Sequence, residues 1–267
     1  MLRLYDTRTG QAQEIKPVPG GPLRLQVRGL PGQRPVHIGD LRVLVVADLI
    51  RRDAEHRHNL ACLLTIWTPD AASSGAYGDG LHADAAALNL SPAEQTDPEP
   101  GPADPVGSGE VIVGTCRVRA GQVLFDGREI ETTDDPVRLP DLAEHGLDPL
   151  ALRLAFLRSR YREPVNLTWD VLSQTDQTIR QWRERVAEWA ESPSKPMRPD
   201  VTARISAALD DDLDTPAALR ALAGLERDPA VPAGSKFETF AHADQLLALD
   251  LSRDIGRPPS SRNNSPS

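Results

Sequence analysis

The sequence predicts an α/β fold, in which a domain built on a parallel β-sheet is followed by a helical domain. Two observations carry this prediction: segments typical of strands and helices alternate through residues 1–138, and helical periodicity dominates over residues 139–256. A strand, a helix and a second strand in that order are typical of a βαβ unit, whose two strands run parallel. The segment 257–267 is rich in proline, serine and asparagine, and we expect it to be disordered.

The βαβ unit is expected near the start of the chain. Residues 23–27 alternate apolar and polar side chains like a half-buried strand, and glycine and proline at 29–32 end it. Residues 36–58 are predicted to form a helix, and the apolar run 60–67 suits a strand that is covered on both faces. Because the start of a helix presents unpaired N–H groups and the positive end of its dipole, this helix predicts a pocket for an anion.

The remaining elements are placed by shorter patterns. Residues 1–15 predict a strand and a turn, 81–90 a short helix, and 110–118 and 122–125 two strands that form a hairpin about Gly121. The proline-rich segment 92–109 is expected to be a mobile loop. In the second domain, the predicted helices are 148–161, 169–191, 200–209 and 215–225.

The chain is acidic, with 30 basic and 39 acidic residues and a formal net charge of −9. Its overall field does not favour nucleic acid, although a local basic patch could still bind RNA. Cys62 and Cys116 form neither a CxxC motif nor a metal-binding spacing, and we expect two buried thiols in a reducing cytoplasm. No apolar run approaches the roughly 18 residues of a membrane span, and no targeting segment is recognised, so we expect a cytoplasmic protein without membrane contact.

Several separated stretches carry a resemblance to a known family. They are residues 2–7, 27–42 with the tetrapeptide His37-Ile38-Gly39-Asp40, 84–90, 126–132, 146–153, 161–167 and 210–216. In order and approximate spacing they resemble the cysteinyl-tRNA synthetases, a family of class I aminoacyl-tRNA synthetases. The resemblance implies a shortened and degenerate paralogue with a truncated Rossmann-like domain of the HUP type, and an adenine nucleotide such as ATP as its ligand.

The resemblance also implies a nucleotide-binding site at the start of the helix. His37 and Gly39 match the HIGH signature of the family, whereas Asp40 replaces its second histidine and would repel phosphate oxygens. Arg42 follows in the same stretch, and Arg128 could replace one cation of the lysine-rich KMSKS loop. Without the resemblance, Gly39 could simply let the helix pack closely on the strand, and Asp40 could be the N-cap of the helix.

Arg28 stands where the family has a zinc-binding cysteine. A guanidinium cannot ligate zinc, and residues 90–110 do not supply the remaining ligands of the family. We therefore expect no zinc and no other metal site. The five histidines other than His37 are expected to be surface or structural residues.

A cluster of arginines is the candidate surface for RNA or another anion. It comprises Arg153, Arg158, Arg160 and Arg162 around Tyr161, and Arg28 could add a further cation. The alternative is a solvated helix end. The acidic run 210–214 is expected to be a turn between helices, in which Asp214 caps the next helix.

These departures from the family pattern predict a synthetase-like protein that is impaired in amino-acid activation. It would be reused to bind a nucleotide, a tRNA or tRNA-like RNA, or a protein partner. The alternative function is an ATP-dependent aminoacyl ligase, which acts on tRNA or joins an amino acid to a non-tRNA acceptor.

Overall fold

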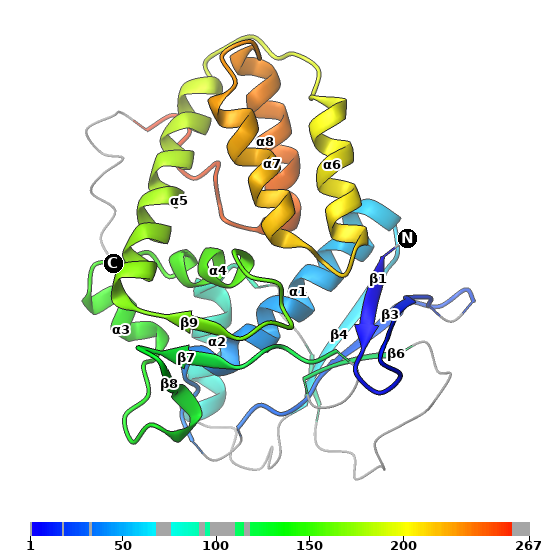
Figure 1. Ribbon diagram of the computed structural model, residues 1–267, viewed down its shortest axis with the longest axis vertical. Coiled ribbons are helices and arrows are strands. Elements are labelled where there is room, and N and C mark those ends of the chain that lie inside the picture. Colours follow the sequence, from blue (N-terminus) through cyan, green and yellow to red (C-terminus); the bar gives the residue numbers. More distant parts are fainter. Residues whose placement is uncertain are drawn as a thin grey trace.

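The computed structural model describes residues 2–17, 19–31, 34–67, 76–90, 94–96, 110–114 and 118–257. Its central element is a four-stranded sheet in which all neighbouring strands run parallel, seen at the lower right of Figure 1. The strands stand in the order β5 (Glu94–Thr96), β4 (Cys62–Trp67), β3 (Leu23–Val27) and β6 (Glu110–Val113). The predicted parallel βαβ unit and the predicted fold class are confirmed.

Helix α1 (Ile38–His58) connects β3 to β4 and packs against both strands. Every second side chain of β3 is buried, as its alternating pattern predicted. Helix α1 also contacts α4 (Leu150–Leu157) and α8 (Ala233–Leu247). Because other elements cover it in this way, α1 has buried residues along most of its length.

Two smaller sheets complete the β-structure. Strands β1 (Arg3–Asp6) and β2 (Gln11–Glu14) pair antiparallel, and β7 (Val123–Phe125) lies between β8 (Arg128–Glu129) and β9 (Val165–Leu167). The predicted hairpin of residues 110–118 and 122–125 is wrong, because β6 pairs with β3 whereas β7 belongs to a different sheet. A strand of three or four residues carries too little pattern to specify its partner, and the strands that β6 and β7 pair with in parallel, β3 and β9, are distant in the sequence.

Part of the segment expected to be a loop forms a strand. Residues 94–96 of the proline-rich segment 92–109 are β5, which pairs in parallel with β4. The rest of that segment lies outside the described residues, as do Cys116 and residues 258–267.

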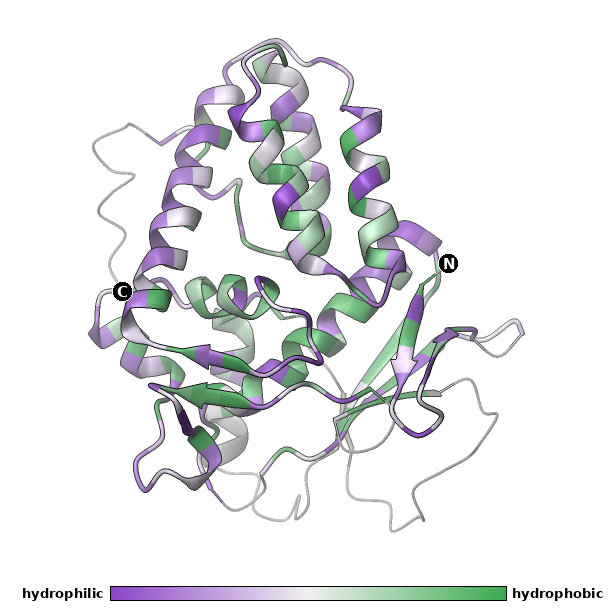
Figure 2. Cartoon of the chain, viewed as in Figure 1, coloured by the Kyte–Doolittle hydropathy of each residue, from purple (hydrophilic) through white to green (hydrophobic). Residues whose placement is uncertain are grey.

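The helices of the second half form a bundle in the upper part of Figure 1, with α4 crossing beneath it. In addition to α1, α4 and α8, the described helices are α2 (Ala76–Ala87), α3 (Leu139–Glu144), α5 (Trp169–Trp189), α6 (Pro199–Asp210), α7 (Thr215–Arg227) and the 3₁₀ turn η2 (Ile130–Thr132). All residues of α4 are buried, and this helix is mostly green in Figure 2. None of the helices in the described ranges is both long and apolar enough to cross a membrane.

The sequence did not predict α8. Its first turns contain Gly234, Ser235 and Thr239, which have weak intrinsic helix propensity. The helix is stabilised instead by tertiary packing, since Phe240 and Leu247 are fully buried.

A buried ion pair joins α1 to α4. The guanidinium of Arg153 donates to Oδ2 of Asp48 at 2.7 Å, and both side chains are essentially inaccessible to solvent. Arg153 also donates to the carbonyl oxygens of Leu247 at 2.7 Å and of Leu88 at 3.2 Å. Burial alone would raise the pKa of Asp48, but Arg153 and the neighbouring arginines hold it below its usual value.

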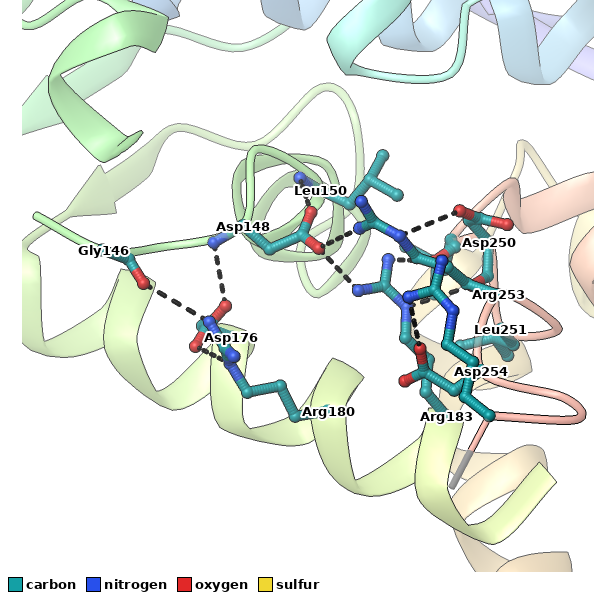
Figure 3. A network of polar contacts seen from close by, with 12 residues as sticks. Gly146, Asp148, Leu150, Asp176, Arg180, Arg183, Asp250, Leu251, Arg253 and Asp254 are labelled. Atoms are coloured by element: carbon teal, nitrogen blue, oxygen red, sulfur yellow. Dashed lines mark hydrogen bonds and ion pairs between the residues drawn. The ribbon is translucent and has the colours of Figure 1, made fainter. Parts of the chain in front are cut away.

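A polar network joins the start of α4 to α5 and to the turn after α8 (Figure 3). Oδ2 of Asp148 accepts hydrogen bonds from Arg183 at 2.5 Å and from Arg253 at 2.9 Å. Arg183 also donates to the carbonyl oxygens of Leu249 and Asp250. Burial alone would raise the pKa of Asp148, but the arginines hold it below its usual value. The adjoining cavity of about 470 Å³ is lined by these paired groups, so we assign the network to packing.

Candidate functional site

A cavity of about 400 Å³ lies at the carboxyl ends of β3 and β6, beside the first turn of α1. The order of the strands explains its position, because the chain passes from β3 to β4 and β5 on one side and returns to β6 on the other. Open α/β sheets bind ligands at such a reversal of strand order. The volume lies within the range of ligand pockets, about 300–1,000 Å³.

Two glycines allow the backbone to close around this cavity. Gly114 has a φ of +120°, and a Cβ at this position would stand 2.0 Å from the carbonyl oxygen of Arg28. A Cβ at Gly39 would stand 2.7 Å from Cγ2 of Ile130 in η2. Gly39 therefore provides a close approach, as one sequence interpretation expected, although the element that it approaches is η2 and not a strand.

The first turn of α1 is held by reciprocal hydrogen bonds. Nδ1 of His37 accepts from the backbone N–H of Asp40 at 3.2 Å, and Oδ2 of Asp40 accepts from the backbone N–H of His37 at 2.9 Å. The N-cap residue is thus His37, and the expectation that Asp40 would be the N-cap is wrong, because Asp40 is the third residue of the helix. Arg34 donates to both carboxylate oxygens of Asp40, at 2.8 and 3.0 Å, and offsets its negative charge.

His37 contributes a buried donor near the start of α1. Its side chain is 1% exposed, and burial lowers its pKa, so the imidazole is neutral at pH 7. Because Nδ1 accepts a hydrogen bond, the proton of the neutral ring is assigned to Nε2. Nε2 has no hydrogen-bond partner among the described residues. A buried donor in this state gains stability from any acceptor that reaches it.

The cavity carries charges of both signs. Arg28 and Arg119 supply positive charge, and Asp40 and Glu131 supply negative charge. The guanidinium of Arg28 donates to Oε1 of Gln26 at 2.8 and 3.2 Å, which fixes its orientation. None of the described residues that line the cavity is a lysine. Arg119 was not among the residues that we had singled out from the sequence, whereas Glu131 belongs to the stretch 126–132 that carries the resemblance.

Two expected nucleotide contacts lie elsewhere. Arg42 is 1% exposed, and its guanidinium donates to the carbonyl oxygens of Gly121 and Gln122 in the cavity wall and of Arg160. Burial lowers the pKa of Arg42 to about 10. Arg42 therefore holds the wall of the cavity and is not placed to contact a ligand. Arg128 is exposed on β8 and does not line the cavity.

The arginine cluster expected to contact RNA is divided by the fold. Arg153 is fully buried and has no surface to offer to an RNA. Arg160 and Arg162 form ion pairs with the acidic turn 211–214, which differs from both the RNA contact and the solvated helix end that we expected. Among these four described arginines, Arg158 alone is exposed and forms no ion pair with the acidic turn. As expected, the last residue of the turn, Asp214, caps α7 by accepting from the N–H of Ala217.

The described residues include one cluster whose side chains could ligate a metal ion. It consists of Asp53, His58 and Asp210, at the end of α1 that is remote from the cavity. We had expected no metal site and a surface or structural role for His58. No sequence pattern pointed to this cluster, because Asp210 comes from α6, far along the chain.

The strand order defines a Rossmann-like α/β fold, and the cavity lies at the position where such folds bind ligands. No family model matches the chain. It is 35% identical over 139 residues to an L-cysteine:1D-myo-inositol 2-amino-2-deoxy-alpha-D-glucopyranoside ligase from Rhodococcus erythropolis, a match that covers 50% of this chain and 33% of the ligase. The same ligase from Mycolicibacterium smegmatis is 33% identical over 139 residues, with the same coverage. The chain thus matches about a third of the length of these relatives, and over half of the chain the similarity to these cysteine ligases confirms the predicted resemblance to the cysteinyl-tRNA synthetase family.

The chain was also compared with solved structures. A putative arginyl-tRNA synthetase from Campylobacter jejuni superposes with a TM-score of 0.48 at 11% sequence identity, covering 86% of this chain and 89% of that one.

Proposed function

We propose that this chain is an ATP-dependent ligase, which activates the carboxyl group of an amino acid and transfers the aminoacyl group to an amine. The observation that carries the proposal is the cavity at the reversal of strand order, next to the N-terminus of α1. Backbone N–H groups at a helix start bind phosphate groups, and this position in the sheet is the usual ligand site of the fold. The named activity of the relatives, a ligase of L-cysteine and an inositol amino sugar, supports this class of reaction.

ATP supplies the activation in such a reaction: the carboxylate displaces pyrophosphate from the α-phosphorus, and the amine then displaces AMP and loses a proton. In this chain Arg28 and Arg119 would offset the negative charge of the phosphates. His37 is buried and does not itself line the cavity, so its part in the proposal is to hold the first turn of α1 beside the cavity. The pairing of Arg34 with Asp40 reduces the repulsion that Asp40 alone would cause.

The amino acid is proposed only as a class. The relatives are named for L-cysteine, but Arg28 lines the cavity at the position where the resemblance implies a zinc-binding cysteine. Recognition of a thiol through zinc is therefore not part of the proposal for this chain.

A second candidate function is nucleotide binding without activation. It is favoured by one observation: Glu131 and Asp40 both line the cavity, where the resemblance implies histidine and lysine as the groups that stabilise charge. An RNA partner has less support, because Arg153 is buried and Arg160 and Arg162 are paired with the acidic turn.

Amino-acid-dependent exchange of pyrophosphate into ATP distinguishes the two functions when it is measured beside ATP binding by calorimetry. The variant His37→Ala removes the Nδ1 acceptor that holds the first turn of α1 beside the cavity. Its matched control is His56→Gln, which changes an exposed histidine at the other end of the same helix. Exchange that falls at least tenfold in His37→Ala and is unchanged in His56→Gln supports the ligase. Binding without exchange supports the second function, and the absence of both contradicts the nucleotide site.

A further inference from the structure

A second cluster of polar side chains lies where the last turns of α1 meet the end of α6. Helix α1 supplies Asp53, Arg57 and His58, and α6 supplies Asp210. Helix α1 has 21 residues and is therefore about 30 Å long, which separates this cluster from the cavity at its other end. Neither the sequence resemblance nor the proposed ligase activity assigns a role to these four side chains.

The distances in the cluster match those of a metal coordination shell. Nε2 of His58 lies 3.3 Å from Oδ2 of Asp53 and 3.7 Å from Oδ1 of Asp210. Ligand atoms of the three residues lie within 4.8 Å of one another. When four ligands surround zinc tetrahedrally at its usual bond lengths, neighbouring ligand atoms stand about 3.4 Å apart. One imidazole and two carboxylates are also a donor set that zinc accepts.

Burial supplies an independent indication of a ligand. The side chain of Asp53 is only 2% exposed, yet its Oδ2 has no hydrogen-bond partner among the described residues, and neither has Nε2 of His58. Buried polar atoms in folded proteins nearly always have such a partner. Each of these two atoms faces the other across 3.3 Å, so a cation between them would satisfy both.

Arg57 orients both carboxylates and leaves Oδ2 of Asp53, which faces His58, available. Its guanidinium pairs with Oδ1 of Asp53, the oxygen that does not face His58, and donates to the carbonyl oxygen of Ser206 at 2.9 Å. It also lies 3.0 Å from Oδ1 of Asp210. With a neutral imidazole, two carboxylates and one guanidinium leave one net negative charge, which favours a divalent cation. Outer groups that hold the ligands in this way are typical of metal sites.

We propose that Asp53, His58 and Asp210 bind one divalent transition-metal ion, for which zinc is the best fit, with water as the fourth ligand. The side chain of Asp210 is 35% exposed, so solvent reaches the cluster and provides both that water and a route for the ion. The ion would link the end of α1 to the end of α6.

Zinc titration of the full chain, freed of any affinity tag and of metal, tests this site. Competition with a chromogenic zinc indicator gives the stoichiometry and affinity, and thermal unfolding gives the change in Tm. We expect one zinc ion per chain and a rise in Tm with zinc. His58→Gln and Asp210→Asn should each weaken zinc binding at least tenfold and abolish the rise in Tm. His56→Gln, an exposed histidine on the same helix, should bind zinc like the wild type.

A proton is the alternative occupant, because a charged His58 could bridge Asp53 and Asp210 as an ion pair. In that case zinc would bind equally well to the wild type and to His58→Gln, or to neither, and either result would overturn the metal site. Cobalt substitution gives a second measurement on the unmodified chain. A tetrahedral site predicts intense visible absorption at one equivalent of cobalt, and its absence would also contradict the proposal. The outcome is independent of nucleotide binding, so it does not depend on the ligase function.

Discussion

Replacement of Arg153 by methionine should destabilise the protein strongly. Methionine retains much of the apolar stem but removes the guanidinium, which donates to Asp48 and to the carbonyl oxygens of Leu88 and Leu247. Breaking a buried ion pair costs about 3–5 kcal/mol, and each buried carbonyl that loses its donor costs about 1–3 kcal/mol. Asp48 keeps hydrogen bonds from Arg51 and Arg52, which places the expected total near the lower end, at about 4–6 kcal/mol.

Urea unfolding followed by far-UV circular dichroism measures this change. Arg153→Lys retains the charge opposite Asp48 but cannot reach both carbonyls in the same geometry, so its loss should be about half as large. Arg158→Met is the matched control, because Arg158 is exposed at the end of the same helix. Its stability should change by less than about 0.5 kcal/mol. Equal unfolding midpoints for Arg153→Met and Arg158→Met would refute the buried network.

Three further predictions concern acid stability, a thiol and the cavity. The pKa of Asp148 lies below its usual 3.8, so the stability that its ionised form provides is complete above pH 3.8 and is lost below it; Asp148→Asn should flatten the acid branch of a pH–Tm curve. Burial raises the pKa of Cys62, which is half-buried and not fully buried as expected, to about 12, so in a Cys116→Ser background the remaining thiol should react with a thiol reagent at pH 8 much more slowly in the folded than in the unfolded protein. Gly39→Ala should weaken ATP binding at least tenfold in calorimetry, because the added Cβ displaces Ile130 beside the cavity. The matched control is Gly80→Ala, because a Cβ at Gly80 contacts nothing, whereas Gly127 is unsuitable as a control because its φ is positive.

The sequence predicted those parts of the fold that depend on neighbouring residues. The unit of β3, α1 and β4 follows from local alternation, a loop and an apolar run, and it was placed within two residues. The pairing of β6 with β3 depends on residues that are far apart, and the hairpin prediction failed there. Helix α8 was missed for a related reason, since packing and not propensity stabilises it.

In the candidate site, too, the sequence identified some residues correctly, whereas the roles of others depend on contacts between distant elements. Gly39, Asp40 and Arg28 were singled out from the sequence and line the cavity. Arg42 and Arg153 were also singled out, but only the fold shows that backbone carbonyls surround their guanidinium groups. A charged residue in a helix is usually exposed, and no sequence pattern distinguishes the rare buried arginine whose partners come from other elements.

The contacts of Asp48 cross the division at residue 138 between the sheet domain and the helical domain that the sequence pattern predicts. Asp48 lies in the middle of α1 and accepts from Arg52 and Arg153, and these two arginines also donate to carbonyl oxygens at the ends of α2 and α8. Charged and backbone groups from both halves of the sequence therefore share one set of hydrogen bonds, and neither half can keep them when it is separated from the other. Residue 138 marks a change in sequence periodicity, and we expect that a chain cut there would leave the buried charges of Asp48 and Arg153 without each other as partners.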